Sequence, residues 1–193
     1  HHLSFGEFGS KFAKAVKAAP HLADPSVVDS EMGTHPELAS VEGVDAVCYT
    51  HNETSTGVAM DLRRPAGTSA ATGLVAVDAT SAAGGLTWSP SEVDVYYFAP
   101  QKCFASDGGL WLAACSPAAL DRIRSIGASD RWRPASLDLQ IALDNSVQNQ
   151  TYNTPALATL ALLVYWRLRC RSLSSTSAAL PLSRQLHPLL LVR

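Results

Sequence analysis

Short, largely continuous runs of apolar residues recur along the first part of the chain. Strands that are covered on both faces carry this pattern, whereas strands with one wet face alternate apolar and polar residues. The runs are residues 45–50, 57–62, 74–77, 93–98 and 110–114, and we expect the second of them at an edge of the sheet. The pattern therefore predicts a buried sheet made of short strands.

A second pattern, apolar residues at helical spacing, marks the first predicted helix. Apolar side chains stand at positions 5, 8, 12 and 16, with lysines on the opposite face. Ser4, followed three residues later by Glu7, forms a capping-box pattern, which predicts that the helix begins there. Pro20 ends the helix because proline has no N–H to donate.

Two pairs of a hydroxyl residue and proline predict two further helices. Ser116-Pro117 should open a helix that runs to about Ile126, with the serine as N-cap. Thr154-Pro155 should open another, with its apolar body at residues 156–166. Residues 20–43 and 128–150 are predicted to be irregular.

Strands that alternate with helices predict an α/β fold with a mostly parallel sheet flanked by helices. The chain has 193 residues, of which 47% are hydrophobic. A chain of this size buries roughly 70% of its unfolded surface, so a substantial core is expected. It can form one domain or a large part of a bigger one.

Charge and cysteine content narrow the choice of partners. The net charge is −2 and the isoelectric point is near 6.3, so we expect neither nucleic acid nor a membrane as partner. No apolar run reaches the roughly 18 residues of a membrane span. The cysteines are widely spaced and form no CxxC pair, which argues against a metal site and a disulfide framework. Reduced thiols in a cytoplasmic protein are the simpler interpretation.

The last part of the chain has a different composition. After Asp144 there is no acidic residue, and from residue 164 onward arginines stand among leucines and serines without clear periodicity. Pro181 and Pro188 would interrupt an amphipathic membrane helix there. We therefore expect residues 1–163 to form a partial large domain and residues 164–193 to be a disordered or irregular basic tail.

Candidate chemistry stands where two predicted strands end. Asp78 ends the run at 74–77, and Lys102 follows the aromatic run at 93–98. An α/β fold builds its active site at the carboxyl ends of its strands. An aspartate and then a lysine on successive strands are the pair that a pyridoxal 5'-phosphate (PLP) enzyme needs.

PLP requires four kinds of group from a protein. A lysine binds its aldehyde, an anion keeps the pyridine nitrogen protonated, donors hold the phosphate, and a polar group contacts the phenolic oxygen of the ring. Lys102 and Asp78 match the first two requirements. The remaining candidates are Gln101, Asn153 and Thr154 for the phosphate and Thr54 for the ring oxygen.

Longer motifs carry a family resemblance. They are Ser-Phe-Gly-Glu-Phe at 4–8, Phe-Ala-Pro-Gln-Lys-Cys-Phe-Ala-Ser-Asp-Gly-Gly-Leu-Trp at 98–111 and Gln-Thr-Tyr-Asn-Thr-Pro at 150–155. Together they resemble the phosphoserine aminotransferase family, class V of the fold-type-I PLP enzymes, over residues 3–162. The resemblance implies a fold-type-I PLP-transferase large domain that is incomplete at both ends.

The resemblance also implies roles for single residues. Lys102 would be the Schiff-base lysine, Asp78 would pair with the pyridine nitrogen, and Thr54 would hydrogen-bond the ring oxygen. Gln101 would contact the cofactor phosphate.

A homodimer with shared active sites is implied as well, in which Asn153 and Thr154 reach the phosphate of the cofactor bound by the other subunit. The reaction would transfer an amino group between glutamate and 3-phosphohydroxypyruvate, giving O-phosphoserine and 2-oxoglutarate. Such a reaction belongs to serine biosynthesis and, in the family, to pyridoxine biosynthesis. Lys102 would also act as the general base at the substrate Cα.

Several elements of the family have no counterpart in the sequence. A glycine-rich phosphate loop, a tryptophan that stacks on the ring and a substrate arginine should precede Ser4. A small domain with the carboxylate-binding arginine should follow about residue 162. Charge-assisted phosphate contacts contribute roughly 1.5–3 kcal/mol each, so their loss should weaken cofactor binding. We therefore expect a truncated fragment that is poorly folded and inactive alone.

Two alternative functions remain open at this point. One is another class V enzyme, of the serine–pyruvate aminotransferase or cysteine desulfurase type. The other is a catalytically inactive fragment that only pairs with a full-length subunit. A nucleotide-binding Rossmann domain is excluded because no GxGxxG follows the first strand. His51 is interpreted as a structural histidine, and Cys103 as a packing residue.

Overall fold

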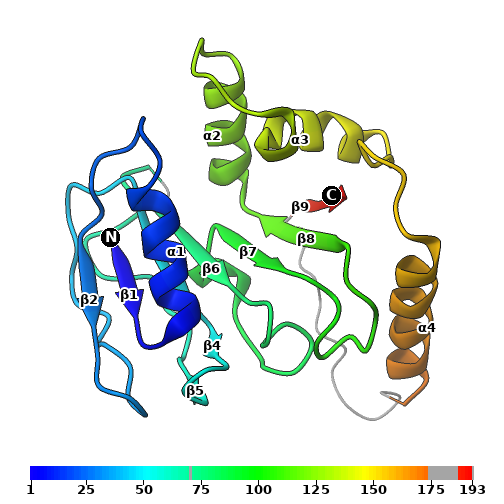
Figure 1. Ribbon diagram of the computed structural model, residues 1–193, viewed down its shortest axis with the longest axis horizontal. Coiled ribbons are helices and arrows are strands. Elements are labelled where there is room, and N and C mark those ends of the chain that lie inside the picture. The colour runs from blue at the N-terminus through cyan, green and yellow to red at the C-terminus, as the bar shows by residue number, and fades with distance from the viewer. Residues whose placement is uncertain (70, 174–186, 193) are drawn as a thin grey trace. The chain divides into compact units, whose positions relative to one another are not determined.

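The computed structural model describes residues 1–69, 71–173 and 187–192. The chain forms two compact units, His1–Tyr96 and Tyr97–Arg193 (Figure 1). The residues proposed to bind PLP are divided between them, with Thr54 and Asp78 in the first unit and Lys102 in the second.

A parallel sheet forms the base of the first unit. Its strands are β1 (His2–Ser4), β2 (Val27–Asp29), β3 (Ala46–Thr50) and β6 (Leu74–Asp78), in the spatial order β2-β1-β3-β6, and β7 (Val95–Phe98) begins beside β6. β3 and β6 pair over their whole length, from Ala46 opposite Leu74 to Thr50 opposite Asp78. The carboxyl ends of both strands therefore lie at the same edge of the sheet.

The helix of this unit, α1 (Glu7–Lys17), packs on β1 and β3 (Figure 1). All of β3 from Val47 to Thr50 is buried, as its continuous apolar run predicts. β6 instead alternates, with Val75 and Val77 buried and the other three residues half-buried. The prediction of burial on both faces thus holds for β3, which has a strand on each side and α1 above it, but not for β6.

The capping-box prediction at Ser4 is wrong. Ser4 is the last residue of β1 and pairs with Asp29 of β2, so strand pairing holds its backbone extended. Its hydroxyl contacts the Ser10 hydroxyl at 3.1 Å. α1 begins at Glu7, and the side chain of Glu7 pairs with Lys11 one turn later, at 3.2 Å.

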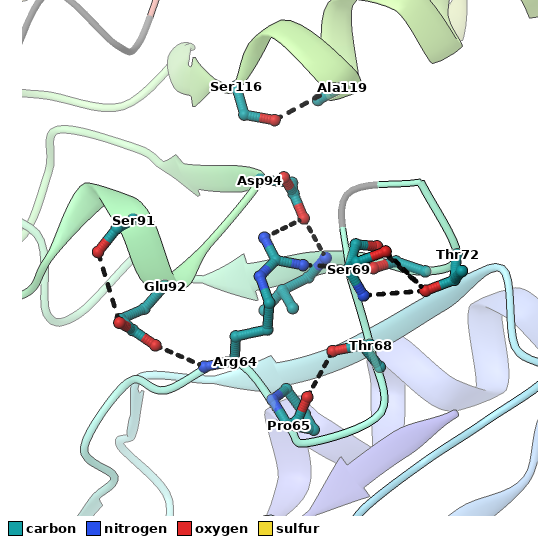
Figure 2. A network of polar contacts seen from close by, with 12 residues as sticks. Arg64, Pro65, Thr68, Ser69, Thr72, Ser91, Glu92, Asp94, Ser116 and Ala119 are labelled. Carbon is teal, nitrogen blue, oxygen red and sulfur yellow. Dashed lines mark hydrogen bonds and ion pairs between the residues drawn. The ribbon is translucent and has the colours of Figure 1, made fainter.

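An ion pair fixes the loop before β6 (Figure 2). The Arg64 guanidinium donates to Asp94 Oδ2 at 2.7 Å, and the same oxygen accepts the Val75 N–H at 2.8 Å. The Arg64 N–H donates to the Glu92 carboxylate at 2.8 Å, at the end of a short 3₁₀ helix (Pro90–Glu92). Because the Asp94 side chain is only 2% exposed, this network ties the loop firmly to β6 and to the entry of β7.

The second unit combines a strand pair with three helices. β8 (Leu110–Cys115) pairs antiparallel with β9 (His187–Val192). The helices are α2 (Pro117–Gly127), α3 (Leu139–Val147) and α4 (Leu157–Leu173), with a 3₁₀ turn at Ala135–Leu137. α3 packs on α2 and β9. These elements and the parallel sheet of the first unit confirm the predicted α/β class.

Most predicted elements are confirmed. The runs at 45–50, 74–77, 93–98 and 110–114 form β3, β6, β7 and β8. The run at 57–62 forms only β5 (Val58–Ala59), which pairs antiparallel with β4 (Asn52–Glu53) in a separate hairpin. The helix after Ser116 is confirmed by α2, and the Ser116 hydroxyl accepts the Ala119 N–H at 3.2 Å, as an N-cap should.

Three predictions of irregular structure differ from the fold. Residues 20–43 contain β2 (Val27–Asp29), which pairs with β1. Residues 128–150 contain α3, whose first turn is capped by Asp138 through the Gln140 N–H at 2.9 Å. In the predicted irregular tail, α4 continues to Leu173 and β9 pairs with β8, whereas residues 174–186 and 193 lie outside the described residues. The expected domain boundary at 163 falls inside α4. Within the described ranges, no helix combines the length and apolarity needed to cross a membrane.

Candidate functional site

Two polar side chains stand at the carboxyl ends of β3 and β6. Thr50 and Asp78 lie opposite each other in the strand register. Asp78 is half-buried, and its Oδ1 accepts the Thr80 N–H at 2.9 Å. Thr50 is 1% exposed, and within the described part of the chain its hydroxyl has no hydrogen-bond partner. The strand ends therefore present a half-buried carboxylate beside a buried hydroxyl.

This arrangement suits a cationic or N–H-bearing ligand. Among the described residues, no lysine, arginine or histidine forms an ion pair with Asp78. A carboxylate in such a place can hold the protonated nitrogen of a pyridine ring, which needs an anion opposite it. The Asp78 carboxylate at this edge thus fits the protonated ring of PLP.

Thr54 lies on the turn of the β4–β5 hairpin, where its side chain is exposed. The hairpin is tied to the segment after β6 by two hydrogen bonds: Asn52 Nδ2 donates to Ser81 Oγ at 2.9 Å, and Ser81 Oγ donates to the Asn52 carbonyl at 2.8 Å. The His51 N–H also donates to the Asp78 carbonyl at 2.9 Å. The structure therefore brings the Thr54 and Asp78 segments together.

Glu53, next to Thr54, has no exposed surface and was not identified by the sequence analysis. Its carboxylate accepts the Gly9 N–H at 2.9 Å, the Phe8 N–H at 3.3 Å and the Ser55 hydroxyl at 2.6 Å. Two of these donors are unpaired amides in the first turn of α1, where negative charge is favoured. Glu53 therefore caps α1 and fixes the hairpin against it.

Gly6 permits this contact between the hairpin and α1. A Cβ at Gly6 would lie 2.5 Å from Glu53 Cγ and 2.5 Å from Ser55 Oγ. Ser55 Oγ also accepts the Glu7 N–H at 2.9 Å, and the Thr56 hydroxyl donates to the Phe5 carbonyl at 2.9 Å. The Ser-Phe-Gly-Glu motif thus serves close backbone packing against the hairpin.

His51 is buried at the base of the same hairpin. Its Nδ1 lies 3.1 Å from the Tyr96 hydroxyl, and the Tyr96 ring stacks on Trp88 with centroids 3.9 Å apart. Burial lowers the pKa of His51 to about 4, against a smaller opposing effect of Asp61, so the ring is neutral at pH 7. These contacts support the interpretation of His51 as a structural histidine.

Lys102 belongs to the second unit, in a turn that follows β7. The turn, residues 100–106, is closed by the Ala105 N–H on the Lys102 carbonyl at 2.9 Å and by the Ser106 N–H on the Pro100 carbonyl at 3.1 Å. The side chains of Gln101, Lys102 and Cys103 are exposed. No described carboxylate pairs with Lys102, so its amine is available to a ligand.

Asn153 and Thr154 are exposed and lie just before α4 in the same unit. The Thr151 hydroxyl donates to the Asn153 carbonyl at 2.7 Å, and the first helical bond of α4 runs from the Leu160 N–H to the Ala156 carbonyl at 3.2 Å. The predicted helix is confirmed, but it begins after Thr154 and Pro155. Both polar side chains are thus left facing outward, available to a ligand or partner.

The six predicted site residues fall into two groups. Thr54 and Asp78 lie on hydrogen-bonded segments of the first unit. The second unit holds Gln101, Lys102, Asn153 and Thr154. Among the described residues, no group of histidine, cysteine and acidic side chains is arranged to hold a metal ion.

The chain has similar sequences among known proteins. No protein-family model matches it. Over 162 residues, it is 64% identical to a phosphoserine aminotransferase of a Nocardioides strain, a match that covers 84% of this chain and 43% of the relative. A phosphoserine aminotransferase of Corynebacterium glutamicum is 60% identical, with the same coverage of both chains. Over 84% of its length, the chain is thus homologous to proteins named phosphoserine aminotransferase.

Solved structures confirm the predicted fold. The chain matches a phosphoserine aminotransferase from Cytophaga hutchinsonii with a TM-score of 0.76 at 22% identity, over 88% of this chain and 49% of that one. An aspartate aminotransferase from Thermus thermophilus matches with a TM-score of 0.63 at 23% identity, over 89% and 49% of the two chains. The fold is therefore that of the fold-type-I PLP aminotransferases. The chain spans less than half the length of the curated relatives above, 43%.

Proposed function

We propose that this chain carries the cofactor-binding part of a PLP-dependent phosphoserine aminotransferase. The whole protein would transfer an amino group between glutamate and 3-phosphohydroxypyruvate. This reaction would be a step of serine biosynthesis in the cytoplasm. The observation that most supports this proposal is the 64% identity over 84% of the chain. An aligned stretch of that length necessarily includes the middle of the chain, with Thr54, Asp78 and Lys102.

Sequence distance favours this function over the other class V activities. The relatives at 64%, 60% and 57% identity are all named phosphoserine aminotransferase. The solved phosphoserine aminotransferase and a solved alanine–glyoxylate aminotransferase from Nostoc match at only 22% and 19% identity, so their names carry no argument about substrate. Because substrate preference diverges faster than fold, the nearer group is the better guide to substrate.

In the first unit, Asp78 would face the pyridine nitrogen and Thr54 would bond the phenolic oxygen of PLP. The half-buried Asp78 carboxylate without a cation and the tied Thr54 hairpin support these roles. Bound PLP supplies the electron sink for chemistry at the substrate Cα. The Asp78 carboxylate, fixed at the end of β6, would keep the pyridine nitrogen of that ring protonated.

In the second unit, Lys102 would bind the cofactor aldehyde and then move a proton at the substrate Cα, while Gln101 would contact the phosphate. An exposed amine without a carboxylate partner supports that role. Asn153 and Thr154 would reach the cofactor phosphate of the second subunit in a homodimer. Their outward position before α4 is what such a contact between subunits requires.

The proposal is tested by trapping the cofactor. The chain is incubated with excess PLP, reduced with borohydride and digested, and the modified lysines are located by mass spectrometry. We expect modification at Lys102 well above that at Lys11, Lys14 and Lys17, which lie in α1 and serve as internal controls. Equal modification of all these lysines would contradict the proposal.

A matched variant separates binding geometry from general reactivity. Asp78→Asn keeps the size of the side chain but removes the anion, so trapping at Lys102 should fall while modification of the α1 lysines stays constant. Formation of glutamate from phosphoserine and 2-oxoglutarate measures turnover. The expected inactivity of the 193-residue chain by itself stays a prediction, and measurable turnover would overturn it.

A further inference from the structure

Thr159 is the one buried polar side chain described in the second unit, with 2% of its surface exposed. It lies in the first turns of α4. Its hydroxyl donates to the Gly108 carbonyl at 3.0 Å, and its own carbonyl accepts the Ser106 hydroxyl at 2.6 Å. Two reciprocal hydrogen bonds thus join α4 to the end of the lysine turn, residues 100–106.

The lysine turn has features that require such support. Ala105 has a φ of 48°, a left-handed conformation that disfavours residues with a Cβ by roughly 1–2 kcal/mol. Two backbone bonds close the turn, on the carbonyls of Lys102 and Pro100. The Phe104 ring stacks on Phe98 with centroids 5.0 Å apart. This stack holds the middle of the turn, whereas the hydrogen bond from the Ser106 hydroxyl to Thr159 holds its end.

The same helix follows the segment with Asn153 and Thr154. Thr159 follows them by six and five residues and lies in the first turn of α4. Thr159 is hydrogen-bonded to both Ser106 and Gly108, so it connects the segment with Asn153 and Thr154 to the lysine turn. All of these residues belong to the second unit.

We propose that Thr159 is a positioning residue that holds the Lys102 turn against α4 and so links the lysine to Asn153 and Thr154. The Ser106–Thr159–Gly108 contacts are called the Thr159 lock below. The inference rests on the proposed function for the meaning of Lys102, but the lock can be tested without it.

The amides that close the turn are the probe. The Ala105 N–H donates to the Lys102 carbonyl, and the Ser106 N–H donates to the Pro100 carbonyl. A hydrogen-bonded amide exchanges with solvent only when its bond opens, so the hydrogen-exchange rates of these two amides report on the lysine turn.

The decisive variant is Ser106→Ala/Thr159→Val, which removes both side-chain donors and keeps nearly the same volume. Loss of two hydrogen bonds should raise the exchange rates of the Ala105 and Ser106 amides roughly tenfold through local opening. Thr159→Ser keeps the hydroxyl and should restore most of the protection when Ser106 is present. The control is Ser129→Ala, which removes an exposed hydroxyl bond to the Ile126 carbonyl, 2.7 Å, elsewhere in the same unit.

A second readout separates positioning from general stability. In the double variant, borohydride trapping of PLP at Lys102 should fall several-fold, while trapping at the α1 lysines stays unchanged. The unfolding midpoint of the Ser129→Ala control should also stay unchanged. Exchange of the Ala105 and Ser106 amides within about twofold of the control, or failure of Thr159→Ser to protect them, would overturn the lock. If the unaltered chain shows no preference for Lys102, the proposed function fails, and amide exchange still decides the lock.

Discussion

Thr54 and Lys102 are held by different chemistry in the two units. Thr54 follows Glu53, a fully buried carboxylate that binds backbone amides of α1. Lys102 lies on a turn whose end is fixed by the neutral hydroxyls of Ser106 and Thr159. All described buried polar side chains except Thr159 lie in the first unit.

The charged and the neutral anchors differ in the strength of their hydrogen bonds and in their sensitivity to the loss of a partner. Hydrogen bonds to a charged group contribute roughly 1.5–3 kcal/mol, against about 1 kcal/mol for neutral ones. A buried carboxylate also becomes a liability once its partner is removed, since an uncompensated charge remains inside. We therefore expect the first unit to be rigid but sensitive to loss of a partner, and the lysine turn to open more readily.

Removal of the Asp94 carboxylate should have the largest effect. Asp94→Ala leaves the Arg64 guanidinium and the Val75 N–H without their acceptor, so the free energy of unfolding should fall by about 3–5 kcal/mol. Denaturant unfolding measures the change. Asp121→Ala, which breaks an exposed ion pair with Arg124 in the second unit, should change it by less than about 1 kcal/mol. Equal losses in the two variants would remove the proposed difference between the units.

Acid should weaken the first unit before the second. The pKa of His51 is lowered to about 4, so between pH 4 and an unfolded value near 6.5 only the unfolded chain binds the proton. The stabilisation is complete above that window and is lost as the pH falls through it, by about 3 kcal/mol. His51→Gln should flatten this part of the pH profile, although His2, with a pKa also near 4, leaves part of the slope.

Asp138 sets the corresponding window in the second unit. Burial alone would raise its pKa, but hydrogen bonds from the Gln140 N–H and from Arg133, together with the charge of Arg133, lower it overall. Its contribution is therefore present above the unfolded pKa of about 3.9 and is lost only below it. Hydrogen exchange as a function of pH should show protection lost first around β3 and β6. Earlier loss around α3 would contradict this order.

Glu53 tests the charged anchor of the Thr54 hairpin. Glu53→Gln keeps the size but removes the charge and turns an NH₂ toward amide donors, so we expect a loss of about 2 kcal/mol. Faster hydrogen exchange at Phe8 and Gly9 would locate the effect. Glu7→Gln is the matched control, because its pair with Lys11 is largely exposed and should contribute less than about 0.5 kcal/mol. Unchanged exchange at Gly9 would refute the anchoring role.

The smallest effect is expected at the N-cap of α2. Ser116→Ala removes the acceptor of the Ala119 N–H and should destabilise the second unit by about 1 kcal/mol, while Ser116→Asp should retain most of the stability. Thermal unfolding of the two variants measures the difference. A loss as large as that of Glu53→Gln would show that neutral anchors are not the weaker class.

Local signals in the sequence predicted much of this architecture. β3, β6 and β8 follow from apolar runs, and α2 follows from Ser116 and Pro117, because each depends on neighbours within a few positions. Asp78 and Lys102 were identified as candidates in the same way, since a polar residue directly after a buried strand is conspicuous.

Contacts distant in sequence could not be predicted. Glu53 binds amides of α1 that are 44 and 45 residues away, and Thr159 binds the lysine turn across 51 and 53 residues. The capping box at Ser4 failed for the same reason, because pairing with β2 overrides the local motif. α3 was missed since its packing on α2 and β9 supports a short helix with a weak pattern of its own.

The sequence by itself determined the fold class and predicted the resemblance to phosphoserine aminotransferases and the six candidate residues, because strands, caps and family motifs are written in consecutive positions. Tertiary structure alone decided how those residues are supported: a buried carboxylate behind Thr54, an unpartnered Thr50 hydroxyl opposite Asp78 within the described residues, and a threonine of α4 behind Lys102. The physical reason is that burial and hydrogen-bond partners are properties of the folded chain, in which residues far apart in sequence exclude water from one another.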